Sequence, residues 1–278
     1  MRLNNITADN PYKYLYIYSI EGRVKHDSEI FDSDFIGNWE EDNFSFLFFK
    51  HSSYAKIEML LDTQPGLALI DKFEMTYEEW QGKMSSPLNI GQFSITTPWE
   101  TYCSLESKIN IIIDPGVVFG TGAHPTTHDC IEALESAFSG EQIDTVIDLG
   151  TGTGLLSIVA AYLGSNKVLA VDINYLSVAT ARNNILLNTM EDRIIPVQGL
   201  AQDFINLPAD LLIANIHYDI MKQLVQAEGF LTKKYFILSG LLNNEAEEIE
   251  VYLSQLPVKI INKWEHAGIW KTILGITL

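Results

Sequence analysis

The stretch Val146-Ile147-Asp148-Leu149-Gly150-Thr151-Gly152-Thr153-Gly154 runs from an apolar strand directly into a Gly-x-Gly-x-Gly turn, and a helical pattern follows it. Glycines suit such a turn because a Cβ would hold a ligand away from the backbone and would disfavour positive φ angles. Asp172 lies 172 − 150 = 22 residues after Gly150, at the end of the next expected strand. A carboxylate there can accept hydrogen bonds from both ribose hydroxyls of a bound nucleoside.

Two cofactor classes use this geometry, and the spacing of the glycines separates them. Dinucleotide binding prefers Gly-x-Gly-x-x-Gly, with the pyrophosphate at the helix N-terminus. Here the third glycine, Gly154, comes one residue early, and the acidic Asp148 precedes the turn. These features favour S-adenosylmethionine over a dinucleotide. A tight turn without any ligand explains three glycines poorly, because each of them costs chain entropy.

Strands and helices alternate regularly on both sides of this turn. Strands are expected at 109–113, 145–148, 168–172, 194–197, 211–215, 235–239, 258–264 and 270–276, and helices start near 126, 154, 176, 218 and 245. Repeated strand-then-helix units predict an α/β fold whose parallel sheet is covered by helices on both faces. The last two strands leave no room for a crossover helix, so one antiparallel strand is expected to close the sheet.

The chain before this region has a different pattern. Strands are expected at 12–20, 44–49 and 67–73 and a short helix at 54–61, which suggests a small α+β domain. Between Thr76 and Pro98, several Gly, Ser and Pro residues indicate a linker with one short strand. We therefore expect a domain over 1–78, a linker over 79–108 and a larger domain over 109–278.

Charge and composition exclude several classes of protein. The 278 residues include 18 Lys and Arg against 36 Asp and Glu, a net charge of −18, which would repel a phosphate backbone and argues against nucleic acid as a direct partner. The two cysteines, Cys103 and Cys130, provide no disulfide framework. The sequence shows neither a signal peptide nor a membrane span, so we expect a cytoplasmic protein.

A second cluster of unusual residues extends from Asp114 to Thr127 and reads Asp-Pro-Gly-Val-Val-Phe-Gly-Thr-Gly-Ala-His-Pro-Thr-Thr. Thr126 or Thr127 could cap the following helix, with Pro125 just outside it. The glycines around Phe119 exceed what a helix start requires, and such a loop could fold over a cofactor as a partial lid. His124 and His128 are four residues apart, but no third ligand is evident, so we expect no metal.

A third cluster, Ala214-Asn215-Ile216-His217-Tyr218, follows an apolar strand. It places Asn215 at the carboxyl edge of the sheet, where doubly wound folds bind ligands. The amide oxygen can accept a hydrogen bond from an amine, and the amide nitrogen can donate one. The alternative is that Asn215 only caps the next helix.

Taken together, these clusters resemble the ribosomal protein L11 methyltransferase family. The similarity also rests on Ala170-Val171-Asp172-Ile173 and Leu238-Ser239-Gly240-Leu241-Leu242, and it extends from about residue 109 to 278. It implies a class I methyltransferase fold, which is a Rossmann-like, mostly parallel sheet of seven strands. It also implies that a small ferredoxin-like domain precedes this fold and docks a basic ribosomal protein. It also implies a protein N-methyltransferase that uses S-adenosylmethionine to modify lysine or N-terminal amines.

The resemblance assigns roles to individual residues. Thr127, Gly150, Asp172 and Asn215 match cofactor positions, and Asn215 also lies beside the substrate amine, where we expect it to orient the lone pair. We add Gly152, Phe119 and Thr121 as cofactor contacts, and Trp99 with Phe119 as wall candidates. We expect a monomer.

The sequence departs from the family pattern at Ala123, His217 and Tyr218, and the first helix of the small domain looks truncated between Ile20 and Phe35. The substrate could therefore be another protein lysine or a small amine. A further alternative is a module that binds the cofactor without turnover.

Overall fold

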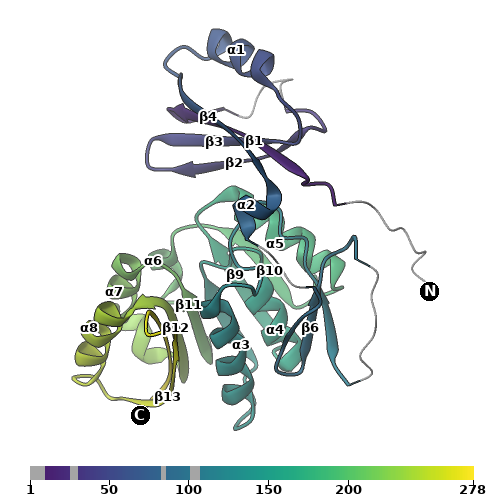
Figure 1. Cartoon of the computed structure of the whole chain (residues 1–278). Coiled ribbons are helices and arrows are strands. Elements are labelled where there is room, and N and C mark those ends of the chain that lie inside the picture. Colours follow the sequence, from purple (N-terminus) through teal and green to yellow (C-terminus); the bar gives the residue numbers. More distant parts are fainter. Residues whose placement is uncertain (1–9, 26–30, 83–85, 101–106) are drawn as a thin grey trace. The chain divides into compact units, whose positions relative to one another are not determined.

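The structure is a computed structural model that describes residues 10–25, 31–82, 86–100 and 107–278. The chain groups into two compact units (Figure 1). The first comprises Met1–Ser85, Pro98–Thr101 and Asn174–Leu176, and the second comprises Ser86–Thr97, Tyr102–Ile173 and Ser177–Leu278. Cys103 lies outside the described residues. In both units, no helix among the described residues is long and apolar enough to cross a membrane.

The first unit contains an antiparallel sheet of four strands in the order β2-β3-β1-β4. Its elements are β1 (Tyr14–Glu21), β2 (Phe35–Glu41), β3 (Phe44–Phe49), α1 (Tyr54–Thr63), β4 (Ala68–Thr76) and α2 (Tyr77–Gln81). Alternate residues of β1, including Tyr18 and Ile20, pack with Leu47 and with Ile57 and Leu60 of α1. One apolar face of the sheet is therefore covered by α1.

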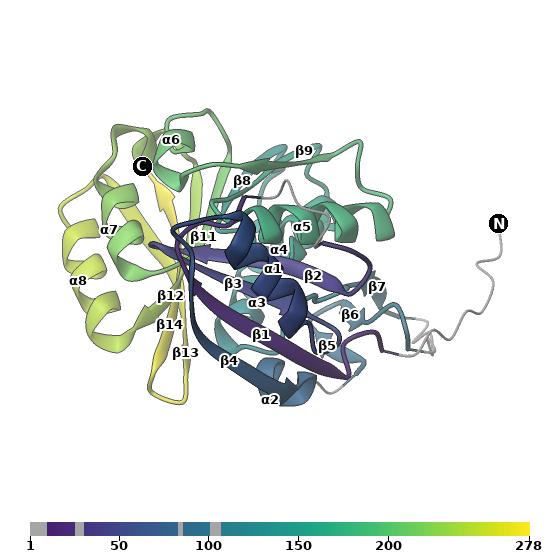
Figure 2. The same ribbon diagram turned by 90° about the horizontal axis from the view of Figure 1, so that it is seen from above.

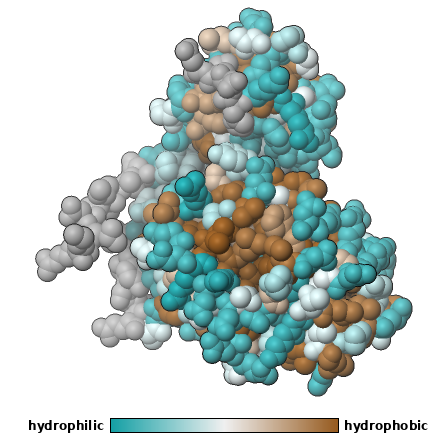
Figure 3. All heavy atoms as spheres, turned by 180° about the vertical axis from the view of Figure 1, so that it is seen from behind, coloured by the Kyte–Doolittle hydropathy of each residue, from teal (hydrophilic) through white to brown (hydrophobic). Residues whose placement is uncertain are grey.

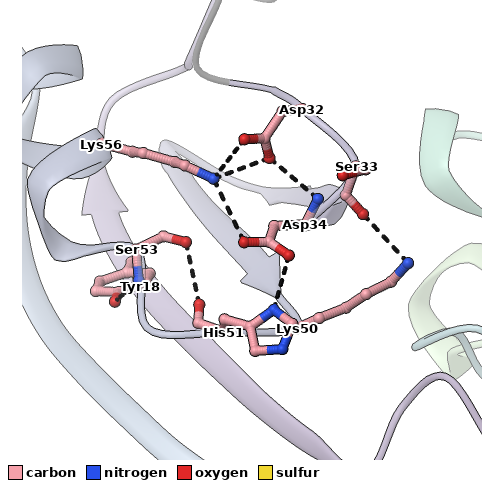
Figure 4. A network of polar contacts seen from close by, with 8 residues as sticks. All are labelled: Tyr18, Asp32, Ser33, Asp34, Lys50, His51, Ser53 and Lys56. Atoms are coloured by element: carbon pink, nitrogen blue, oxygen red, sulfur yellow. Dashed lines mark hydrogen bonds and ion pairs between the residues drawn. The ribbon is translucent and has the colours of Figure 1, made fainter.

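A polar network holds the segment before β2 against α1 and the end of β3 (Figure 4). The Lys56 ammonium donates to both carboxylate oxygens of Asp32 at 2.8 Å and lies 3.6 Å from Asp34. The Nδ1 atom of His51 lies 2.7 Å from the other oxygen of Asp34. These contacts lower the pKa of both aspartates and raise the pKa of Lys56.

The ferredoxin-like description of this unit is not confirmed. The described residues between β1 and β2, 22–25 and 31–34, form no helix, and residues 26–30 lie outside the described part. Val24 and Phe31 are the apolar side chains described in this segment, too few to form a buried helix face. The expected helix at 54–61 and the expected strands at 12–20, 44–49 and 67–73 are confirmed by α1, β1, β3 and β4.

The segment expected as a linker contains two short strands. β5 (Leu88–Ile90) and β6 (Phe93–Thr96) form a three-stranded sheet with β7 (Ile109–Ile112). Phe93 and Ile95 are fully buried in the core of the second unit. The strand expected at 109–113 is β7, which pairs with β6 and does not join the large sheet. Its Ile111 is buried in the same core as Leu134 of α3 (Pro125–Phe138).

The large sheet of the second unit has seven strands in the order β10-β9-β8-β11-β12-β14-β13. Its strands are β8 (Thr145–Leu149), β9 (Lys167–Asp172), β10 (Ile194–Gln198), β11 (Leu211–Asn215), β12 (Tyr235–Leu242), β13 (Val258–His266) and β14 (Trp270–Thr277). The sheet is mixed, which corrects the expectation of a mostly parallel sheet. β14 lies between β12 and β13 and is antiparallel to both. A short turn joins β13 directly to β14, so these two strands run in opposite directions.

Helices cover both faces of this sheet (Figure 2). α3 and α4 (Leu155–Leu163) bury Leu134 and Ile158 against Val146 on one face, and α5 (Tyr175–Leu187) adds Ile185 to the same cluster. On the opposite face, α7 (Tyr218–Gln226) and α8 (Asn243–Leu253) pack against alternate residues such as Ile147 and Leu149 of β8. The short α6 (Ala201–Phe204) and a 3-10 helix (Glu228–Thr232) complete the unit.

The face of the molecule in Figure 3 shows a broad apolar area on the second unit. Exposed apolar side chains on α5 and on the edge strand β10 include Leu186, Leu187 and Ile195. Pro196 stands in the middle of β10 and has no backbone N–H. This edge therefore cannot offer a full hydrogen-bonding ladder to another strand.

Candidate cofactor and substrate site

The glycine turn after β8 requires its glycines for identifiable reasons. Gly150, Gly152 and Gly154 have φ angles of +77°, +54° and +82°, a region that other L-residues rarely adopt. A Cβ on Gly152 would lie 2.4 Å from the carbonyl oxygen of Phe119. The turn and the loop that carries Phe119 therefore touch through their backbones.

Asp172 at the end of β9 is tied to the same turn. Its Oδ2 atom accepts a hydrogen bond from the backbone N–H of Gly152 at 3.0 Å. The two strands β8 and β9 are parallel neighbours, so their carboxyl ends meet at one edge of the sheet. The structure thus brings together the glycine turn and the carboxylate that the sequence spacing predicted.

The loop from 114 to 127 lies against this edge. The backbone N–H of Thr153 donates to the Phe119 carbonyl at 3.1 Å, and the Thr153 hydroxyl donates to the carbonyl of Gly120 at 2.5 Å. The side chain of Phe119 is half exposed, whereas Thr121 is buried. The loop is therefore fixed to the glycine turn by its backbone and leaves the Phe119 ring accessible.

Helix α3 starts at Pro125, and His124 is its N-cap residue. The His124 Nδ1 atom accepts a hydrogen bond from the backbone N–H of Thr126 at 3.3 Å. The expected capping by Thr126 or Thr127 is wrong, because Pro125 is the first helical residue and the cap therefore falls on His124, two residues before Thr126. Thr127 instead has a buried hydroxyl oxygen without a hydrogen-bond partner in the described part of the chain.

Asn215 ends β11 and lies directly beside the glycine turn. A Cβ on Gly150 would lie 2.1 Å from Cγ2 of Ile216, and a Cβ on Gly240 would lie 3.0 Å from Oδ1 of Asn215. The two glycines therefore enclose the segment Asn215–Ile216. The alternative role of Asn215 as a helix cap is wrong, because α7 begins at Tyr218 and its N-cap residue is His217.

Comparisons with known proteins identify the family of this chain. The model of the ribosomal protein L11 methyltransferase family matches residues 22–276. The chain belongs to this family. The match covers most of the first unit as well as the second, and so extends further than the similarity from residue 109 that the motifs indicated.

Individual relatives support the same assignment. The chain is 34% identical over 232 residues to the ribosomal protein L11 methyltransferase of Desulforamulus reducens, covering 80% of this chain and 74% of that protein. It is 38% identical over 199 residues to that of Anoxybacillus flavithermus, covering 69% of this chain and 63% of that protein. Among solved structures, the ribosomal protein L11 methylase of Lactobacillus delbrueckii subsp. bulgaricus matches with a TM-score of 0.60 and 28% identity, covering 70% of this chain and 100% of that chain.

The methyl donor of this L11 methyltransferase family member is S-adenosylmethionine, and the residues at the edge of the sheet fit it. The cofactor carries a ribose diol and positive charge at its sulfonium and amino groups, and it has no phosphate. The edge offers the carboxylate of Asp172 and the buried, unpartnered oxygen atoms of Asp148 and Thr127. These oxygen atoms can accept hydrogen bonds from the ribose diol and the ammonium group, which agrees with the preference for this cofactor over a dinucleotide.

Asp148 forms a buried network to which the sequence analysis assigned no specific contact. Its Oδ2 atom accepts hydrogen bonds from the hydroxyls of Thr151 at 2.7 Å and Ser157 at 2.6 Å. Burial raises the pKa of Asp148 to about 6, and the two hydroxyls oppose this change. In the sequence, this residue stands out as a carboxyl group in an otherwise apolar strand. In the fold, its hydrogen bonds hold Thr151 of the glycine turn in place.

Two further residues of the site could not be inferred from local patterns. Trp270 packs edge-to-face on His124 at 5.1 Å between ring centroids, and His124 packs in the same way on Phe119 at 5.1 Å. Burial lowers the pKa of His124, and nearby His266 adds to the effect. Gly240 is the second of these residues. Its role is to leave room for the Asn215 side chain on the neighbouring strand β11.

Three further residues considered in the sequence analysis have contacts of their own. Trp99, a wall candidate, groups with the first unit and packs edge-to-face on Tyr12 at 5.7 Å. His128 lies 3.6 Å from Glu132 on the next turn of α3, whereas His124 caps the helix. The two histidines therefore serve separate contacts.

Proposed function

We propose that this chain transfers methyl groups from S-adenosylmethionine to lysine or N-terminal amines of ribosomal protein L11. The observation that carries the proposal is the position of Asn215, which ends β11 beside the glycine turn and lies against Gly240. Asn215 would orient the amine, and Gly150, Gly152, Asp172, Thr127, Phe119 and Thr121 would hold the cofactor.

The mechanism needs alignment more than acid or base catalysis. When bound, S-adenosylmethionine supplies an electrophilic methyl group and a sulfur leaving group. The Asn215 amide oxygen would accept a hydrogen bond from the amine and so direct its lone pair to the methyl carbon. The exposed ring of Phe119 and the neighbouring rings of His124 and Trp270 would exclude water from this edge.

The amine must be neutral before it can react. With a reference pKa near 10.4, deprotonating a lysine at pH 7 costs roughly 4.6 kcal/mol. Surface carboxylates would raise this pKa, so the acidic character of the chain cannot activate the amine. Apolar surroundings oppose the charged form of the amine, as burial does for His124, whose pKa is lowered.

The further aspects of this function are also proposals. The region 1–78 would dock the substrate, and 109–278, together with β5 and β6, would carry out transfer. The net charge of −18 suits a basic protein partner without direct nucleic-acid contact. We propose that the chain acts as a monomer in the cytoplasm, and size-exclusion chromatography with light scattering would test the oligomeric state.

The decisive experiment is methylation with purified components. The chain, ribosomal protein L11 and methyl-labelled S-adenosylmethionine should give labelled L11, and mass spectrometry should locate the label on lysine or N-terminal amines. Calorimetry that detects no binding of the cofactor or of its demethylated product would refute the proposal. Binding without any methylated product would indicate a module that holds the cofactor.

A different substrate is the second candidate. The histidine and tyrosine that follow Asn215-Ile216, His217 and Tyr218, favour it because they change the head of α7 beside the site. Labelling of a whole lysate would distinguish the two candidates. A labelled band other than L11, with L11 itself unlabelled, would favour this second candidate.

A further inference from the structure

A groove runs between α7 and α8 on the outer side of the large sheet. The two helices lie side by side in both ribbon views (Figures 1 and 2). The groove has a volume of about 590 Å³. Its lining comes from one side of each helix, from Tyr218 to Gln226 on α7 and from Asn244 to Gln255 on and just beyond α8.

One end of the groove lies at the edge of the sheet that carries the site. β11 and β12 are parallel neighbours, with Asn215 opposite Ser239, so α7 and α8 leave the sheet at the same edge. Tyr218, the first residue of α7, lies three residues after Asn215 and lines the groove. The groove therefore extends away from the proposed position of the amine.

The groove combines an apolar floor with a polar wall. Val225 and Ile249 are almost fully buried beneath it. On the wall, the Tyr218 hydroxyl donates to the carboxylate of Glu248, and the Lys222 ammonium lies 4.0 Å from the same carboxylate. The Lys222 ammonium also lies 5.5 Å from the centroid of the Tyr218 ring. Tyr218 is thus held in place by two neighbours, which reduces the entropy that it would lose on binding a partner.

The charge of this surface is negative. Glu247 and Glu248 line the groove against the single cation Lys222, which already faces Glu248. α8 carries Glu245 in addition and contains no basic residue, whereas Glu250 is paired with Lys263 at 3.0 Å. A positively charged segment is therefore the complementary occupant.

We propose that this groove holds the polypeptide segment next to the methylated amine, as an extended stretch with at least one basic side chain. The inference rests on the proposed function and specifies where the substrate chain beside the amine would lie. The nine residues of α7 span about 13 Å at 1.5 Å each, which accommodates about four extended residues at 3.3 Å each. A tyrosine beside an apolar floor, with carboxylates at the rim, matches the composition of peptide-binding surfaces.

The test reverses the charge of the wall. In the double variant Glu247→Lys/Glu248→Lys, the KM for L11 should rise about tenfold, because two attractive contacts become repulsive. The kcat should stay within about twofold, and so should methylation of N-acetyl-lysine amide, which is too short to enter the groove. The difference in KM should shrink at high salt, since these charges are solvent-exposed.

A matched control and a reciprocal variant make the test specific. Glu191→Lys/Asp192→Lys changes the charge equally at two exposed positions of the same unit outside the groove, and its KM should equal that of the wild type. Lys222→Gln makes the groove more negative and should lower the KM about twofold to threefold. Unfolding temperatures and cofactor affinities of all variants establish that they fold.

The outcomes separate the inference from the proposed function. If the wild type methylates L11 and the double variant does so with an unchanged KM, the groove does not bind the substrate. The same conclusion follows if Lys222→Gln raises the KM. If the wild type does not methylate L11, the proposed function fails. The groove is then judged by the Kd of a fluorescein-labelled lysine-rich tetrapeptide, which should increase in the double variant but not in the control.

Discussion

Replacing Gly152 with alanine tests how the cofactor turn is built. At a φ of +54°, an alanine costs about 1–2 kcal/mol in backbone strain. Its Cβ would lie 2.4 Å from the Phe119 carbonyl oxygen, so one of the two backbones must move. Relief of such a contact typically adds about 1–3 kcal/mol. We expect Gly152→Ala to lower the free energy of unfolding by about 2–5 kcal/mol.

The same displacement should weaken cofactor binding. The Gly152 N–H donates to Asp172, so a shift of the turn also disturbs the carboxylate proposed to hold the ribose. Calorimetry with S-adenosylmethionine should show a Kd at least about tenfold above the wild-type value, equal to about 1.4 kcal/mol. Urea-induced unfolding, followed without the cofactor, gives the stability change separately.

Gly164→Ala provides the control. Gly164 also has a positive φ, +126°, and follows α4 in the same unit, but an added Cβ would meet nothing within 4 Å. It should lose stability through backbone strain and keep the wild-type cofactor affinity. If Gly152→Ala binds the cofactor as tightly as the wild type does, the contact with Phe119 does not shape the binding site and our reasoning is refuted.

Three further predictions concern catalysis and stability. Asn215→Ala should reduce kcat for methyl transfer on the order of 100-fold through loss of amine alignment, with a smaller change in cofactor Kd; unchanged kcat would contradict our assignment. Because burial raises the pKa of Asp148 from 3.8 to about 6, the folded chain binds this proton more tightly than the unfolded chain. Urea titrations without the cofactor should therefore show wild-type stability, relative to Asp148→Asn, rising by roughly 2 kcal/mol between pH 7 and pH 4; a constant difference would contradict this. In the first unit, Lys56→Met should lower the unfolding temperature much less than Leu60→Ala does. Lys56→Met removes exposed ion pairs, whereas Leu60→Ala leaves a core cavity that costs about 2–5 kcal/mol. The reverse order in scanning calorimetry would contradict this.

Elements of the second unit could be predicted from the sequence because their signals are local. Apolar runs bounded by glycines and polar residues marked β8, β9 and β11, and the spacing between Gly150 and Asp172 placed both at one edge of the sheet. Asn215 could be placed in the same way, since parallel strands share a carboxyl edge.

The errors occurred where partners far apart in the chain decide the structure. The expected strand at 109–113 pairs with β6, and nothing within that stretch distinguishes this pairing from membership of the large sheet. The cap of α3 depends on the side chain of His124, which competes with two equally suitable threonines. The site residue Trp270 lies 146 residues after its partner His124 (270 − 124), so no motif connects them.

The sequence by itself determined the class of the large unit, the cofactor turn and the family, because glycine spacing and a short polar signature report directly on backbone geometry. Tertiary structure alone decided how Gly240 confines Asn215, how β14 is inserted between β12 and β13, and that a groove lies between α7 and α8. These features arise from packing between elements that are distant in sequence. Packing depends on the shapes of both partners, whereas a local pattern records only one of them.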